Sequence, residues 1–221
     1  MARRTKEEAK QTRHIILESA ERLFFEQGVA RTTLEEIARA AGVTRGAVYW
    51  HFRNKADLFE ALQVQVRLPK EDAIRNLLSQ ADEQSLQSLS CMLTDVLQVM
   101  ATDVRRRRVF TILFHRCEYV EEMRVIVQRM HDHLEQLLEQ SVHFFEMAMR
   151  RGELSPHWSP AAAAFGLHGL MLGLLTRMLE SDDATSSLAL AQECVMSFFE
   201  SIAAASTKKV DRTGFAGGCL R

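Results

Sequence analysis

The chain has 221 residues, 47% of them hydrophobic, with ten glycines and three prolines, so it can bury a sizeable core as one large domain or as a small domain joined to a medium one. The N-terminal MARRTKEE has no apolar segment behind it, and the apolar run 161–176 is shorter than the roughly 20 residues that cross a bilayer. These features argue against a signal peptide and a membrane span, and we expect a cytoplasmic protein.

The net charge of −1 conceals an asymmetry along the chain. Residues 1–55 hold 11 lysines and arginines against 7 aspartates and glutamates, whereas residues 56–221 hold 17 against 22. The first quarter therefore suits a polyanion, although such an excess in so short a segment can also arise by chance. The four cysteines share no short spacing such as CxxC, so we interpret them as reduced thiols and expect no disulfide framework, metal or cofactor.

A capping box opens the first predicted helix, because Thr5 is followed three residues later by Glu8. The helix is expected to run from Lys6 to Gln27 and to end at Gly28. Its apolar face carries Ile16, Ala20, Leu23 and Phe24.

Two short helices separated by a glycine turn come next. The second helix, 34–40, follows threonines that have glutamates three residues later, and it ends at Ala41-Gly42. Thr44 then opens the third helix. A short helix, a glycine turn and a second short helix are typical of the helix-turn-helix. Its small core is expected to contain Leu34, Ile37, Ala38, Val43, Val48 and Phe52.

Four aromatic residues stand side by side in the third helix, within VTRGAVYWHFRNK. Val48 and Phe52 lie four residues apart and face inward, which leaves Tyr49 and Trp50 on the other side. A helix in the major groove presents its N-terminal residues to base edges, and Arg45 has the forked donor that matches guanine O6 and N7. The sequence therefore predicts a DNA-reading helix. For Trp50, partial burial against the first helix is an equally good alternative to exposure on the reading face.

These motifs carry a family resemblance. The stretch Ala30–Leu62, above all AAGVTRGAVYWHF and NKADLF, resembles the DNA-binding domain of the TetR family of bacterial repressors, and the likeness covers residues 3–66 closely. MARRTKEEA and FHRCEY are similar to the AcrR and TtgR type, which are repressors beside genes for multidrug efflux pumps. The resemblance implies an all-α homodimer that binds a palindromic operator and is released by a small-molecule inducer.

The resemblance also implies residue roles and a domain division. Its helix-turn-helix domain corresponds to residues 1–55, its ligand-binding and dimerisation domain to 56–205, and 206–221 is predicted to be a disordered tail. Hydroxyls, an imidazole and cationic groups near the reading helix are candidates for phosphate contacts, and two arginines are a candidate arm for the DNA backbone or minor groove. The predicted DNA-binding residues are Arg3, Arg4, Thr33, Thr44, Arg45, Gly46, Tyr49, His51 and Lys55.

Helical patterns cover most of the remaining sequence. Asn54 with Asp57 caps a fourth helix that begins at Lys55 and is interrupted near Pro69. Ser159 followed by Pro160 is a strong start signal, N-cap and then first helical position. The further helices are predicted at 85–102, 103–116, 121–150, 160–180 and 185–205, which gives about nine helices in all.

Two stripes predict a dimer interface. Three glycines inside the 160–180 helix cost roughly 1 kcal/mol each relative to alanine, and the close approach of another helix would offset that cost. Apolar residues at 3-4-3-4 spacing on the last helix form a seam for a partner helix. Alternatively, both stripes face the core of their own domain. The predicted interface consists of Ala162, Gly166, Gly169, Gly173, Leu188, Val195, Phe198 and Ile202.

A ligand pocket is the most indirect prediction. Four pairs of residues, each pair four residues apart on one helix, lie at positions where the helices of the family line one internal pocket. Such pairs are also common in an ordinary hydrophobic core. The candidate residues are Met92, Val96, Phe110, Phe114, Leu137, Ser141, His168 and Leu172. Phe110, Phe114 and Leu172 stand where relatives tend to place polar groups, which favours flat apolar ligands held by stacking.

Two other functions compete with efflux repression. An enzyme would need converging groups, but His131 and His133 lie two apart and diverge on a helix, so we expect no catalytic residues. A regulator of the same fold that activates, or that senses a metabolite or an acyl ligand, stays open. The run Arg105–Arg108 points around all sides of a helix, so we expect it to cap or pair with an acidic neighbour rather than bind nucleic acid.

Overall fold

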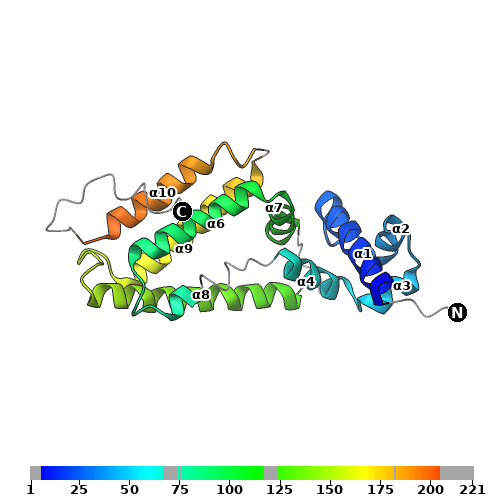
Figure 1. The fold of residues 1–221 in the computed structure, drawn as a ribbon, viewed down its shortest axis with the longest axis horizontal. Coiled ribbons are helices and arrows are strands. Elements are labelled where there is room, and N and C mark those ends of the chain that lie inside the picture. The colour runs from blue at the N-terminus through cyan, green and yellow to red at the C-terminus, as the bar shows by residue number, and fades with distance from the viewer. Residues whose placement is uncertain (1–5, 67–73, 75, 117–123, 182, 205–221) are drawn as a thin grey trace. The chain divides into compact units, whose positions relative to one another are not determined.

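The computed structural model describes residues 6–66, 74, 76–116, 124–181 and 183–204. Within these residues the chain is helical and contains no strand beyond one isolated bridge between Leu154 and Ala203, so the predicted all-α class is confirmed (Figure 1). The elements are α1 Lys6–Gln27, α2 Leu34–Ala40, α3 Arg45–His51, α4 Lys55–Val66, α6 Leu86–Thr102, α7 Val104–Thr111, the π-helical turn η1 Ile112–Arg116, α8 Arg124–Arg150, α9 Pro160–Glu180 and α10 Leu188–Ile202.

The chain forms two compact units. The first contains residues 1–67 and 105–131, and the second contains residues 68–104 and 132–221. The first unit thus combines α1 to α4 with most of α7, η1 and the start of α8. The predicted domain boundary after residue 55 stays a prediction.

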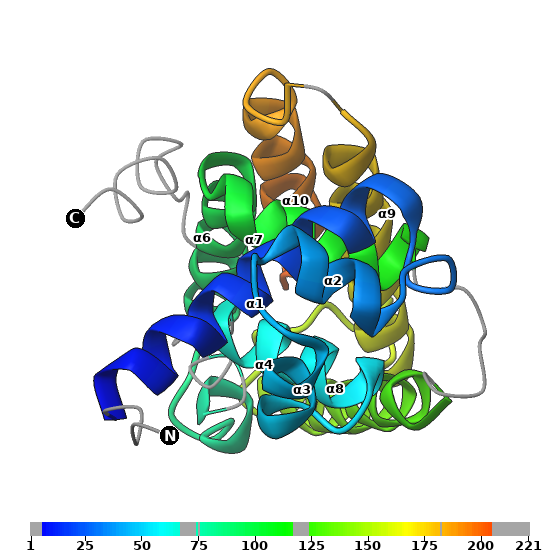
Figure 2. The same ribbon diagram turned by 90° about the vertical axis from the view of Figure 1, so that its right-hand side faces the viewer.

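The core of the first unit lies between α1 and the three helices that follow it. α2 and α3 both pack against α1 (Figure 2), and Val48 and Phe52 of α3 are buried as predicted. Gly28 and Gly42 have φ values of 86° and 65°, a conformation that glycine adopts at little cost. The buried cluster consists of Ile16, Leu17, Ala20, Phe24, Val29, Ile37, Ala38, Val48, Phe52, Leu58, Phe59, Ala61, Leu62, Ile112 and Ile126.

α7 and η1 are tied to α1 by polar contacts as well. The Glu21 carboxylate, almost fully buried, accepts hydrogen bonds from Arg105 Nε at 2.9 Å and from Arg108 at 3.1 Å. The amide of Val29 donates to the carbonyl of Arg116 at 3.1 Å. The arginine run therefore supplies two ion pairs to an acidic neighbour, as its sequence suggested.

In the second unit, α10 packs against α6 and α9 (Figure 1). Its buried stripe is Ala191, Val195, Phe199 and Ile202. Val195 and Ile202 are 0% exposed within the single chain, so the prediction that these two residues line a dimer interface is wrong. Their spacing shows a shared face, and α6 of the same chain is the element that covers this face.

The glycines of the predicted interface on α9 also fall into two groups, one that packs within the chain and one that does not. A methyl group added at Gly166 would lie 3.4 Å from the Phe198 ring of α10, so Gly166 permits contact within the chain. At Gly169 and Gly173, a methyl group would meet no described atom within 4 Å. Phe165, on the same helix, is 73% exposed. These outer positions leave the predicted interface on α9 open to a second chain.

Two sequence expectations need correction. Cys91 is disulfide-bonded, whereas Cys194 carries a free thiol, so the prediction of four reduced cysteines is wrong. Spacing along the chain does not show which thiols meet in space. α9 is also long and apolar enough, by length and composition alone, to cross a membrane. A single such helix is weak support for a membrane span, and α9 contacts both α6 and α10.

Candidate nucleic-acid interface

The turn before α2 is fixed by a reciprocal cap. The hydroxyl oxygen of Thr33 accepts the Glu36 amide at 3.2 Å, while the Glu36 carboxylate accepts the Thr33 amide at 2.8 Å and the Thr33 hydroxyl at 2.9 Å. Hydrogen bonds from the backbone and then the side chain of Thr33 lower the pKa of Glu36. Thr33, a predicted phosphate contact, is exposed, but its hydroxyl proton is directed to Glu36.

α3 presents its other side chains to solvent. Thr44 caps the helix by accepting the Ala47 amide at 3.2 Å. Tyr49 is 48% exposed and Trp50 is 73% exposed. The Trp50 ring lies edge-on to His51, with ring centroids 4.5 Å apart. Of the two alternatives for Trp50, the structure therefore shows the exposed one, on the face that holds Tyr49.

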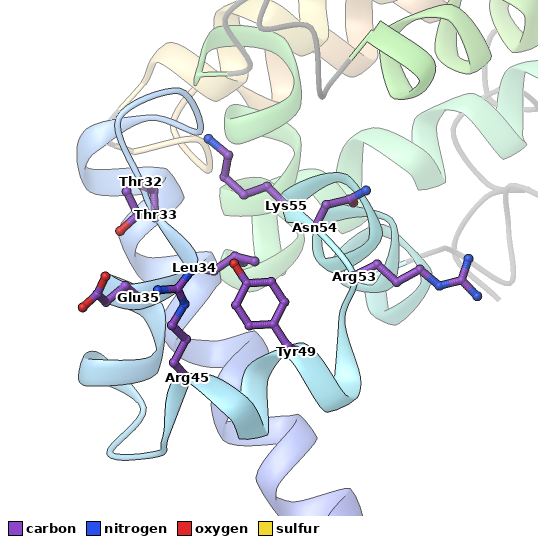
Figure 3. Close-up of a pocket in the computed structure, with 9 residues that line it drawn as sticks. All are labelled: Thr32, Thr33, Leu34, Glu35, Arg45, Tyr49, Arg53, Asn54 and Lys55. Carbon is purple, nitrogen blue, oxygen red and sulfur yellow. The ribbon is translucent and has the colours of Figure 1, made fainter.

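Arg45, Tyr49 and Glu35 meet in one surface depression. The Arg45 guanidinium lies 5.4 Å from the centre of the Tyr49 ring. Figure 3 shows it between the Tyr49 hydroxyl and the Glu35 carboxylate, which comes from α2. The Tyr49 hydroxyl first, and then the charge of Glu35, raise the pKa of Arg45. The residue predicted to read guanine is thus held on the exposed face by neighbours from two helices.

Lys55 has a partner inside the protein. Its ammonium donates to the carbonyls of Val29 at 3.1 Å and Ala30 at 3.4 Å, which ties the first residue of α4 to the loop before α2. In Figure 3 the side chain extends away from Arg45. The predicted phosphate role of Lys55 therefore coexists with a structural role.

Four of the nine residues that line the depression are predicted DNA contacts, namely Thr33, Arg45, Tyr49 and Lys55. Glu35 and Arg53 line the same depression as the predicted residues. Glu35 stands in the first turn of α2, and this position was the available signal for it. Arg3 and Arg4, the predicted arm, lie outside the described residues.

The predicted ligand residues are distributed over both units. In the first unit, Phe110 and Phe114 stack with ring centroids 6.2 Å apart. In the second unit, Ser141 and His168 lie 3.1 Å apart. The remaining candidates are buried Val96, half-buried Met92 and Leu137, and exposed Leu172, all in the second unit.

The Ser141–His168 contact defines a tautomer. Ser141 donates its only hydroxyl proton to a hydrogen bond with the Leu137 carbonyl at 2.8 Å, so its oxygen accepts a hydrogen bond from the Nε2–H group of His168. Burial lowers the pKa of His168, and the charge of Glu135 opposes this effect. The neutral ring therefore leaves Nδ1 as an acceptor.

The geometry of the exposed α3 face suits the binding of a nucleic acid. Among the described residues, no group of three or more His, Cys, Asp or Glu side chains is arranged to hold a metal ion. An exposed aromatic and cationic face on the second helix of a helix-turn-helix defines a DNA-binding protein.

The comparisons with known proteins identify the family. A profile described as "Bacterial regulatory proteins, tetR family" matches residues 16–62, and one described as "MAATS-type transcriptional repressor, C-terminal region" matches residues 84–202. The transcriptional regulator TtgR of Pseudomonas putida is 39% identical over 191 residues, which are 85% of this chain and 90% of TtgR. The chain belongs to the TetR family of transcriptional regulators and is not an enzyme.

Two solved structures are similar over most of the chain. The structure of NalD, the secondary repressor of the MexAB-OprM multidrug efflux pump in Pseudomonas aeruginosa, is 40% identical with a TM-score of 0.73, covering 87% of this chain and 98% of NalD. The SmeT–triclosan complex is 32% identical with a TM-score of 0.67, covering 85% of this chain and 90% of SmeT. The likeness to the TtgR type of the family, expected from the sequence, is confirmed.

Proposed function

We propose that this protein is a cytoplasmic, ligand-responsive repressor that binds a palindromic operator as a homodimer and controls a multidrug efflux operon. The observation that carries the proposal is the exposed face of α3, where Arg45 and Tyr49 lie together beside the turn that precedes α2. The description of NalD as a repressor of a multidrug efflux pump supports the choice of operon.

In this proposal, residues 1–55 bind the operator and residues 56–205 bind the inducer and form the dimer. Arg45 reads a base edge, while Thr44, Tyr49, His51 and Lys55 contact phosphates and Gly46 allows close approach of the backbone. Thr33 joins them once its hydroxyl turns from Glu36 to a phosphate. The exposed positions Ala162, Gly169 and Gly173 of α9, with Leu188 of α10, contribute to the interface between subunits.

The proposed inducers are apolar or aromatic drug-like molecules. Within the first unit, stacked Phe110 and Phe114 offer flat ring surfaces to such a molecule. Within the second unit, His168 offers one acceptor nitrogen. The SmeT complex contains triclosan, which supports a small organic molecule as the inducer. A ligand that prefers a wider spacing of the two reading heads than the roughly 34–36 Å between successive major grooves lowers operator affinity.

Fluorescence anisotropy with labelled duplexes tests operator binding. The intergenic DNA beside the gene should contain a palindrome that binds in preference to a scrambled duplex. The plot of log affinity against log salt should slope by about −0.9 for each neutralised phosphate. A flat salt response, or equal affinity for the scrambled duplex, would contradict the proposal.

Titration calorimetry with triclosan, dyes and plant phenolics tests induction. The compounds should bind free protein more tightly than operator-bound protein, with a reciprocal coupling of about 1–3 kcal/mol. Phe114→Ala and His168→Ala should weaken the compounds and leave drug-free operator affinity unchanged. Equal binding to both forms would remove the inducer role and leave the DNA-binding role standing.

A further inference from the structure

Glu35 is an acidic side chain on a surface proposed to bind a polyanion. It is exposed, lines the same depression as Arg45 and Tyr49, and comes from α2 rather than from the reading helix (Figure 3). A carboxylate at this position repels phosphates, so it lowers the affinity for any duplex. Its neighbour Glu36 differs, because the Glu36 carboxylate is held in the cap by Thr33.

The position of Glu35 relative to Arg45 gives that repulsion a selective effect. An arginine side chain that is free in solvent gives up rotamer freedom when it binds, and it pairs readily with a phosphate. Here the Tyr49 ring supports one face of the guanidinium and Glu35 supplies a compensating charge. A guanine edge is uncharged and meets no repulsion from Glu35, whereas a phosphate brought to the same guanidinium does.

We propose that Glu35 is a specificity-determining residue that, together with Tyr49, positions Arg45 for a base edge and disfavours its pairing with phosphate. This inference rests on the proposed reading role of Arg45. Glu35 acts through Arg45 and need not touch DNA itself.

Two glutamine substitutions in the same turn of α2 form a matched pair. Glu35→Gln and Glu36→Gln each remove one negative charge from the first turn, so they change the net charge and the interaction with the helix dipole alike. Glutamine can also replace glutamate in a capping box, which protects the Glu36 variant from loss of the cap. Only the first substitution removes the charge beside Arg45.

The readout is the ratio of affinities for operator and scrambled duplex at one salt concentration. Two unit charges 4 Å apart in water interact by an energy equivalent to about a fivefold change in affinity. Glu35→Gln should therefore lower the ratio by up to about fivefold, mainly by raising affinity for the scrambled duplex. Glu36→Gln should leave the ratio unchanged. Equal effects of the two substitutions would overturn the inference.

A double-mutant cycle separates the inference from the function on which it rests. In an Arg45→Ala background, Glu35→Gln should no longer change the ratio, because the positioned group is missing. A change that persists there would show that Glu35 acts on phosphates directly and would overturn the positioning role. If Arg45→Ala alone leaves operator affinity and base preference intact, the reading role of Arg45 fails first.

Discussion

Replacing Glu21 by glutamine should destabilise the protein measurably. The Glu21 side chain is 4% exposed, and its partners Arg105 and Arg108 are 39% and 40% exposed. Glutamine keeps the shape but loses the charge and one of the two accepting oxygens. A hydrogen bond to a charged group contributes about 1.5–3 kcal/mol, and the half-exposed arginines recover part of this from water. We therefore expect the free energy of unfolding to fall by about 2 kcal/mol.

Urea unfolding followed by circular dichroism, at one fixed protein concentration, measures this loss. Glu18→Gln is the matched control, because Glu18 lies on the same helix with its side chain 58% exposed. Within the described part of the chain, its one ion-pair partner is His14, at 3.3 Å. A surface pair of this kind contributes about 0–1 kcal/mol. If Glu21→Gln unfolds at the same urea concentration as the unsubstituted protein, or if both variants shift equally, the buried pair does not stabilise the unit.

Three further predictions concern reading, assembly and pH. Arg45→Ala should cost about 1–3 kcal/mol of operator affinity and relax preference at one base pair, whereas Lys55→Ala should weaken all duplexes alike in anisotropy titrations. Gly173→Leu should leave the protomer folded, because the site is open, yet sedimentation should show loss of the dimer. Since burial lowers the pKa of His168, the unfolded state binds more protons than the folded state. The free energy of unfolding measured in urea should therefore fall as the pH drops below about 6.5, and it should fall less in His168→Asn.

Helix boundaries could be predicted from the sequence because local signals determine them. The glycine at position 28 and the Ser159-Pro160 pair fixed the observed ends of α1 and α9. The capping box of α2 forms with Thr33, one of the two threonines that the pattern allowed. Each of these signals needs only neighbours within four residues along the chain.

The partners of a helix face could not be predicted in the same way. The apolar stripe of α10 was identified only in part, because Val195 and Ile202 belong to it whereas Leu188 and Phe198 are half-buried. Val195 and Ile202 pack inside their own chain, on the face that meets α6. Periodicity specifies which side chains share a face, whereas the neighbouring helix that covers the face depends on contacts between distant segments. The Glu21–Arg105 pair, 84 residues apart in sequence, lay beyond local reasoning for the same reason.

The contacts of the first unit also bear on how the reading surface moves. Lys55 ties the start of α4 to the loop before α2, and Glu21 ties α1 to α7. The buried side chain of Ile112 joins η1 to the same core as α1 and α3. Because packed cores resist continuous deformation, a displacement of α4 or α7 must carry α1, α2 and α3 with it. If the proposed function holds, an inducer therefore changes operator affinity by moving the reading helices together. Weakening the Glu21 pair should then reduce the coupling between drug and operator more than it reduces the affinity for the drug.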